Sequence, residues 1–169
     1  MRDIADRSGV ALATLYRYFA SKELLFAHAV VAWGGAFVAD AKRRAGNAVS
    51  DAERMQQTFR KTIKAYERWP NFYRLIAALA ITDDAEARQF FERFSVQYQE
   101  SLRSVLEHTD PEDAAVVAQV LLATLGRALR KWSVGEWETA QVYDHMSRAV
   151  ALIFGQPRGI DDQGRECIQ

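Results

Sequence analysis

The chain has 169 residues, and its 22 lysines and arginines balance 22 aspartates and glutamates, so the protein has no net charge. Hydrophobic residues make up 49% of the chain and charged residues 26%, which is typical of a soluble globular protein. The single cysteine, Cys167, excludes a disulfide framework or a cysteine-based metal site within one chain. No apolar run approaches the roughly 20 residues of a membrane span. We therefore expect a cytoplasmic protein with no membrane partner.

The charges are unevenly distributed along the chain. Residues 1–44 carry seven lysines and arginines against four aspartates and glutamates, whereas the remainder carries fifteen against eighteen. A basic front end on an acidic body suits a protein that presents one end to phosphates.

The hydrophobic periodicity is helical throughout and predicts an all-α protein. Two short helices, at about 2–8 and 12–19, flank a turn at Gly9. A long helix begins near Ser21, which is a good N-cap, and runs to Arg43 or Arg44 before a stop at residues 45–47.

Prolines, acidic caps and glycines then divide the rest of the chain. Pro70 separates two helices, Asp84 caps another, Asp110-Pro111 is a strong helix start, and Gly135 breaks the chain. The tail after residue 155 contains few large apolar groups and is expected to be flexible. The helices predicted in this part of the chain span about 51–68, 70–81, 84–108, 112–132 and 138–154.

The strongest motif lies in the first 19 residues. A small residue, Ala5, suits the close crossing of two helices, and Gly9 suits a tight turn that needs positive φ. This spacing favours a helix-turn-helix whose second helix can enter a major groove, although a plain helical hairpin is the alternative. The residues expected to close the small core are Ile4, Val10, Leu15 and Tyr18.

The next residues favour the DNA-binding alternative. Residues 14–23, Thr-Leu-Tyr-Arg-Tyr-Phe-Ala-Ser-Lys-Glu, surround one short helix with hydroxyl and basic groups. Together with Arg2-Asp3-Ile4-Ala5-Asp6, this stretch resembles the DNA-binding signature of the TetR family. The resemblance implies a TetR-like fold, with an N-terminal helix-turn-helix followed by a helical bundle that binds a ligand and dimerises. The domains expected are 1–22, a partial DNA-binding domain; 23–155, the ligand-binding and dimerisation domain; and 156–169, the flexible tail.

The resemblance also implies roles for single residues. Thr14, Tyr18 and Lys22 would contact phosphates, while Tyr16 and Arg17 would face the groove, with Arg17 able to pair with a guanine edge. Two features depart from the family pattern. Ala11 occupies the recognition-helix N-cap, where the family usually has Ser or Thr. The family's first helix, which normally precedes Arg2, is missing, so a helical ligand-binding and dimerisation module without functional DNA binding is the alternative.

Aromatic side chains are unusually frequent between residues 55 and 98. The resemblance implies that they surround an apolar cavity for a hydrophobic small-molecule effector, whereas the simpler interpretation is ordinary core. Gly34-Gly35 would allow close packing or bend the long helix near that cavity. The candidate residues for polar contacts with the ligand are Gln97, Tyr98, Tyr66 and Thr124. The expected pocket residues are Trp33, Phe37, Phe59, Tyr66, Phe72, Phe91, Phe94, Tyr98 and Thr124.

The last two helices are apolar on more than one face, so one face can meet the body and another a partner. The resemblance implies a homodimer bound to palindromic double-stranded operator DNA; the alternative is that these helices are internal. The residues expected at the dimer interface are Val120, Leu121, Val142, Met146 and Val150.

No catalytic or cofactor motif is visible. The three histidines stand apart, and there is no P-loop, G-x-S-x-G or G-x-G-x-x-G, so we expect no enzyme, no cofactor and no metal. The leading hypothesis is a repressor released by a hydrophobic ligand. Residues 14–22 and Lys131-Trp132-Ser133 are also similar to the actinobacterial steroid-catabolism regulators of the TetR family, which implies a sterol-derived acyl thioester as effector.

Overall fold

The computed structural model describes residues 1–39, 48 and 50–155, and it describes the side chains of these residues except 36–39. Every regular element in the described part of the chain is an α-helix, which confirms the predicted all-α class. No helix in that part is long and apolar enough to cross a membrane. The predicted end of the long helix, the stop at residues 45–47 and the tail 156–169 lie outside the described residues.

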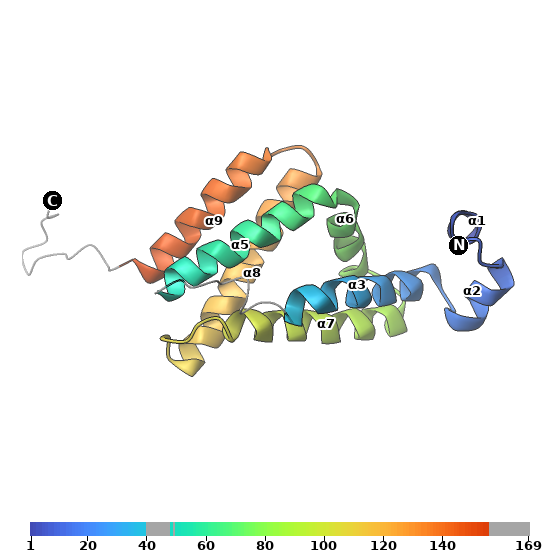
Figure 1. Ribbon diagram of the computed structural model, residues 1–169, viewed down its shortest axis with the longest axis horizontal. Helices are drawn as coiled ribbons and strands as arrows, with labels where there is room; N and C mark the ends of the chain where they lie inside the picture. Colours follow the sequence, from blue (N-terminus) through green and yellow to red (C-terminus); the bar gives the residue numbers. More distant parts are fainter. Residues whose placement is uncertain (40–47, 49, 156–169) are drawn as a thin grey trace, which may run out of the picture.

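Three helices form the N-terminal part: α1 (Arg2–Ser8), α2 (Leu12–Tyr18) and α3 (Lys22–Ala39). Gly9 ends α1 with a φ of 69°, in the left-handed region that favours glycine. The Leu24 amide donates to Ser21 Oγ at 2.9 Å, so Ser21 caps α3 as predicted. Figure 1 shows α1 and α2 at one end of the molecule, joined to the body through α3.

The body contains five further helices: α5 (Asp51–Arg68), α6 (Pro70–Leu79), α7 (Ala85–Arg103), α8 (Pro111–Ser133) and α9 (Thr139–Phe154). Side-chain caps begin three of them: Ser50 accepts from the Glu53 amide, Asp84 from Glu86 and Ala87, and Asp110 from Glu112. These local signals explain why most of the predicted helix starts agree with the structure within one residue.

The predicted helix 84–108 is wrong at its C-terminal end, because α7 stops at Arg103. The amides of Glu107 and His108 donate to the Asp51 carboxylate at 3.0 and 2.9 Å, and the Thr109 hydroxyl donates to it at 2.7 Å. In a longer helix, those amides would donate to carbonyls one turn earlier. A carboxylate on α5, distant in sequence, therefore holds the chain out of the helix.

Two groups of buried side chains hold the helices together. The large core cluster joins α5, α8 and α9 with the C-terminal part of α7 and includes Met55, Phe59, Leu121 and Met146. The small core cluster joins α3, α6 and the N-terminal part of α7. Its buried members are Ala27, Val30, Leu79, Ala87 and Phe94. In Figure 1, α3 runs beside α7 while α5 and α9 lie at the opposite side of the body. Helix α7 thus takes part in both clusters.

Candidate DNA-reading module and ligand cavity

The helix pair α1–α2 has the predicted crossing. Ala5 and Leu15 are buried, with 6% and 8% of their surface exposed, on either side of the turn at Gly9. The predicted core role of Tyr18 is wrong, since 67% of this side chain is exposed, and Val10 is also exposed at 37%. The seven-residue α1 buries only Ala5 and leaves the last turn of α2 uncovered. Ala11 has no side-chain capping bond, as its sequence implies.

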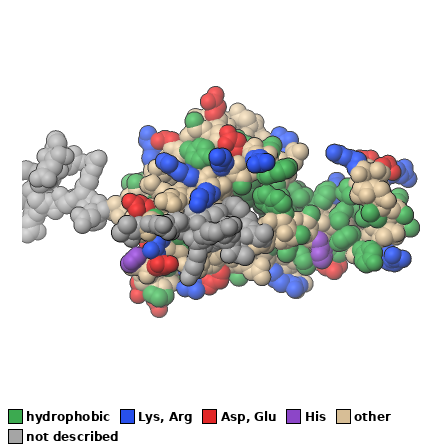
Figure 2. Space-filling view, in the orientation of Figure 1, with side chains coloured by type: hydrophobic (Ala, Val, Ile, Leu, Met, Phe, Trp, Pro, Cys, Tyr) green, Lys and Arg blue, Asp and Glu red, His purple; other side chains and the backbone are tan. Residues whose placement is uncertain are grey.

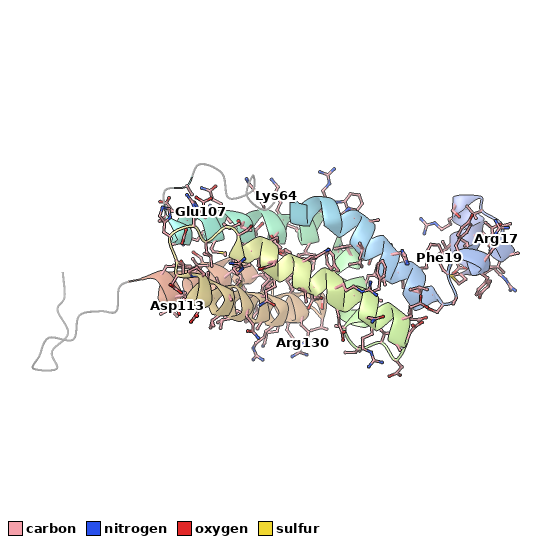
Figure 3. The ribbon with its side chains drawn as sticks, turned by 90° about the horizontal axis from the view of Figure 1, so that it is seen from below. Arg17, Phe19, Lys64, Glu107, Asp113 and Arg130 are labelled. Atoms are coloured by element: carbon pink, nitrogen blue, oxygen red, sulfur yellow. The ribbon has the colours of Figure 1, made fainter. Side chains whose placement is uncertain are left out.

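The side chains predicted to meet DNA lie at the free end of the molecule. Tyr16, Arg17 and Tyr18 are exposed on α2, Lys22 is exposed at the start of α3, and Thr14 is half-buried. The Arg17 guanidinium lies 5.3 Å from the centroid of the Tyr18 ring. Figure 3 shows Arg17 projecting from the end remote from the body, and in Figure 2 the α1–α2 lobe shows basic side chains together with acidic ones on the face in view. This arrangement can present cations and hydroxyls to a DNA backbone and groove.

Two contacts join the end of α2 to the body. The Ser21 hydroxyl donates to the Asp84 carboxylate, so the N-caps of α3 and α7 are bonded to each other. The amide of Ala87, the Ser21 hydroxyl and the amide of Glu86 outweigh desolvation and hold the pKa of Asp84 below its usual value. The second contact is an aromatic stack in which the His28 ring lies 5.4 Å from Phe19 and 4.1 Å from Phe90. A movement of the N-terminal part of α7 would therefore displace the C-terminal end of α2.

A cavity of about 240 Å³ lies between the two core clusters. Six of the predicted pocket residues line it: Trp33, Tyr66, Phe72, Phe91, Phe94 and Tyr98. The second aromatic pocket residue predicted on α3, Phe37, lies outside the described side chains. The remaining lining residues are Gly34, Thr62, Ala65, Tyr73, Ile76, Ser95, Leu122, Leu125, Gly126 and Leu129.

Two predicted pocket residues do not line the cavity. Phe59 is 1% exposed and packs inside the large core cluster. On α8 the cavity meets residues 122, 125, 126 and 129, which share one helical face, and Thr124 points away from that face. The Thr124 hydroxyl donates to the Val120 carbonyl at 2.8 Å instead. Gln97, sought as an anchor, is exposed and is also outside the lining. Helical periodicity identifies the apolar face of a helix, but it does not distinguish residues that line a cavity from residues that fill the core.

Gly34 determines how closely α3 approaches the cavity wall. A Cβ atom built at Gly34 would lie 2.5 Å from Cζ of Phe94, whereas one built at Gly35 meets nothing within 4 Å. The sequence predicts close packing or a bend near the pocket at both glycines. In the structure, only Gly34 is in such a contact, and it also lines the cavity.

We expect Gly34→Ala to displace the Phe94 ring, and Gly35→Ala is the matched control. Both changes improve helix propensity by roughly 1 kcal/mol, but overpacking beside a buried ring costs about 1–3 kcal/mol. Chemical denaturation should therefore find the Gly34→Ala protein less stable than the Gly35→Ala protein by about 1–3 kcal/mol. Equal stability of the two variants would contradict the close contact between Gly34 and Phe94.

The residues predicted for a dimer interface are divided by the structure. Leu121, Val142, Met146 and Val150 are at most 2% exposed and belong to the protomer's own core, because α8 and α9 pack against each other and α9 packs against α5. Only Val120, at 47%, is exposed. The other large apolar side chains exposed on the same two helices are Val116 and Leu152.

Comparison with known proteins agrees with this geometry. Residues 1–29 match the family model of bacterial regulatory proteins, tetR family. The HTH-type transcriptional repressors KstR of Rhodococcus jostii and Mycobacterium tuberculosis are each 26% identical over 156 residues, which is 92% of this chain and 73% and 71% of those proteins. The fold is similar to a TetR transcriptional regulator from Rhodococcus sp. RHA1, with a TM-score of 0.68 and 19% identity over 91% of this chain and 83% of that one.

An exposed second helix in a helix-turn-helix, carried by an all-helical body, defines a DNA-binding regulator. The match of residues 1–29 and the similarity to the KstR repressors over most of the chain together support a transcriptional regulator of the TetR type.

Proposed function

We propose that this protein is a transcriptional repressor that binds a palindromic operator as a homodimer and leaves it when a hydrophobic small molecule fills the cavity. It acts in the cytoplasm and catalyses no reaction. The position of the cavity carries the proposal: it lies between the two core clusters, and the cluster on one side includes α3, the helix that leads to α2.

Helix α2 reads the operator. Tyr16 and Arg17 face the major groove, with Arg17 paired to a guanine edge, while Thr14, Tyr18 and Lys22 hold the phosphates. The exposure of four of these side chains at the free end of the molecule supports this division. Residues 1–22 form the DNA-reading unit and residues 23–155 the ligand-binding and dimerising unit.

The route from ligand to DNA runs through α7 and α3. Phe91 and Phe94 of α7 line the cavity, and Asp84 at the N-cap of the same helix accepts the Ser21 hydroxyl at the N-cap of α3. An occupant that favours a different separation of the two core clusters would move α3 and change the spacing of the two recognition helices in a dimer. The shift is limited by the ligand's differential affinity for the two arrangements.

The lining indicates the type of effector. The aromatic and aliphatic walls suit an apolar ring system, such as the sterol part of the acyl thioester that the sequence resemblance implies. The lining contains no lysine or arginine within the part of the chain that the structure describes, so any anionic group of such a molecule would have to remain outside the cavity.

Dimerisation uses the outer faces of α8 and α9. Val116, Val120 and Leu152 are exposed there at 58%, 47% and 83%, and burying such side chains is a common source of dimer stability. A two-fold dimer would place two copies of α2 on the two half-sites of a palindrome.

The decisive experiment joins DNA binding to the cavity. Operator fragments are selected from a random DNA pool by the purified protein, and small molecules that co-purify with it are identified by native mass spectrometry. Adding such a molecule should weaken operator binding about 5- to 150-fold, the usual range of allosteric coupling.

The Ala65→Leu variant, which places a branched side chain in the cavity wall, should bind the operator but respond weakly to the molecule. A response of equal size in both proteins would contradict the effector site. Binding to DNA without any sequence preference would favour the alternative of a helical module that does not read DNA.

A further inference from the structure

The described part of the cavity wall offers no ionised side chain to a charged ligand. Among its lining residues in the described part of the chain there is no Asp, Glu, Lys, Arg or His, and aromatic rings of Trp33, Phe72, Phe91 and Phe94 form much of the wall. An ion placed there would lose its hydration without a compensating charge. The described lining therefore disfavours an anionic group inside the cavity, and flat uncharged rings can pack against several aromatic walls at once.

Most hydroxyl groups around the cavity are already engaged with the protein. Three of them donate to backbone carbonyls: Thr62 to Thr58 at 2.9 Å, Ser95 to Phe91 at 3.0 Å and Tyr73 to Gly126 at 3.1 Å. The Tyr98 hydroxyl lies 3.5 Å from the Thr62 hydroxyl, within hydrogen-bond distance.

Tyr66 differs from these residues. Among the described residues its hydroxyl has no hydrogen-bond partner, although its ring is fixed by contacts with Phe72 and Tyr73 at centroid distances of 6.2 and 5.7 Å. Burial, followed by the nearby Tyr98 and Tyr73, raises the pKa of Tyr66 well above its usual value. The phenol therefore keeps its proton at neutral pH and is a neutral hydrogen-bond donor. A hydroxyl on the cavity wall without a protein partner is available to donate to a ligand or to water.

We propose that the cavity selects an uncharged ring compound bearing a hydrogen-bond acceptor, and that the Tyr66 hydroxyl donates to that acceptor. This inference rests on the proposed effector site and adds to it the chemical class of the occupant and the residue that recognises its polar end. Shape and apolar area supply most of the affinity, whereas Tyr66 distinguishes a ketone, ether or hydroxyl from plain hydrocarbon.

The test uses two uncharged fluorescent probes of nearly equal shape. The first is prodan, a naphthalene ketone whose emission moves to longer wavelength when its carbonyl accepts a hydrogen bond; the second is its analogue with the ketone replaced by a methylene group. Their binding is measured by fluorescence titration of the wild-type protein, Tyr66→Phe and the control Tyr73→Phe. Tyr73 lines the same cavity, but its hydroxyl already donates to Gly126. Circular dichroism checks that each variant is folded.

Tyr66→Phe should weaken prodan binding about threefold to tenfold, the value of one neutral hydrogen bond, and move the emission of the bound probe to shorter wavelength. It should leave the affinity of the methylene analogue unchanged, while Tyr73→Phe should affect both probes equally. If Tyr66→Phe changes both probes by the same factor, or changes neither, the role of Tyr66 is refuted while the effector site stands. If the wild-type protein binds neither probe, or if Ala65→Leu leaves both affinities unchanged, the effector site itself is refuted, and this inference with it.

Discussion

An Arg17→Ala variant is expected to lose about 5- to 150-fold in affinity for its selected operator, because a bidentate contact to a guanine edge contributes roughly 1–3 kcal/mol of discrimination. Arg17 is exposed near the end of α2, remote from both core clusters, so the substitution should not change the stability of the fold. Electrophoretic mobility shift or fluorescence anisotropy, carried out with operator and with scrambled DNA, measures both affinities.

The loss should be confined to operator DNA. Arg130→Ala removes the same charge from α8, on the body and away from the α1–α2 lobe (Figure 3), and is the matched control. We expect the control to bind like the wild type. The contrary result is that Arg17→Ala weakens binding to operator and to scrambled DNA equally, and lowers the slope of log affinity against log salt concentration by about one. That result would mean that Arg17 contacts a phosphate and does not read a base.

The largest effect on stability is expected from Asp51→Asn. The Asp51 side chain is 5% exposed, accepts bonds from the amides of Glu107 and His108 and from the Thr109 hydroxyl, and lies 3.3 Å from His108 Nδ1. An asparagine keeps only one acceptor oxygen and turns an amide NH₂ toward donors. We expect a loss of about 2–4 kcal/mol in the free energy of unfolding, measured by urea denaturation at pH 7.

The same site gives the pH dependence of that loss. Burial works to raise the pKa of Asp51, but the hydrogen bonds from Thr109, His108 and Glu107 outweigh it and hold the pKa below its usual value. A carboxylate with a lowered folded-state pKa stabilises the fold above its unfolded pKa, and this contribution disappears as the pH falls through the folded value. The difference between wild type and Asp51→Asn should therefore be constant from about pH 5 to 7 and shrink below about pH 4.

Asp113→Asn provides the control for charge removal. Asp113 is an exposed acid in the first turn of α8 (Figure 3), so its replacement should cost less than about 1 kcal/mol. A comparable loss in the two variants would mean that the Asp51 bonds do not hold the α7–α8 connection.

The helices were predictable because their signals are local. Gly9 takes the left-handed turn, Ser21 and Asp84 cap helices, and Pro70 and Pro111 occupy first turns where a missing amide proton costs nothing. Each signal acts within a few residues of the boundary that it determines. The end of α7 was not predictable in this way, because the carboxylate that ends it belongs to Asp51 on another helix.

The cavity was predictable only in part. Six aromatic residues were correctly placed on its wall, yet Phe59 carries the same sequence signal and fills the core instead. Whether an apolar face borders a void depends on how several helices meet, here the five helices that line the cavity, and no single helix encodes their separation. Likewise, the two-sided apolar pattern of α8 and α9 does not reveal which side the protomer itself covers; Leu121 and Met146 proved internal, whereas Val120 is exposed.

Methylation interference on the selected operator tests the central claim most directly, because a methyl group on guanine N7 blocks contacts in the major groove and leaves phosphates untouched. If α2 reads base edges in a two-fold complex, guanines in two symmetric half-sites, with centres about one helical turn or a multiple of it apart, should interfere with binding. Arg17→Ala should abolish interference at one guanine in each half-site. An unchanged pattern without Arg17 would show that Arg17 reads no base. Interference at no guanine would contradict recognition of base edges by α2.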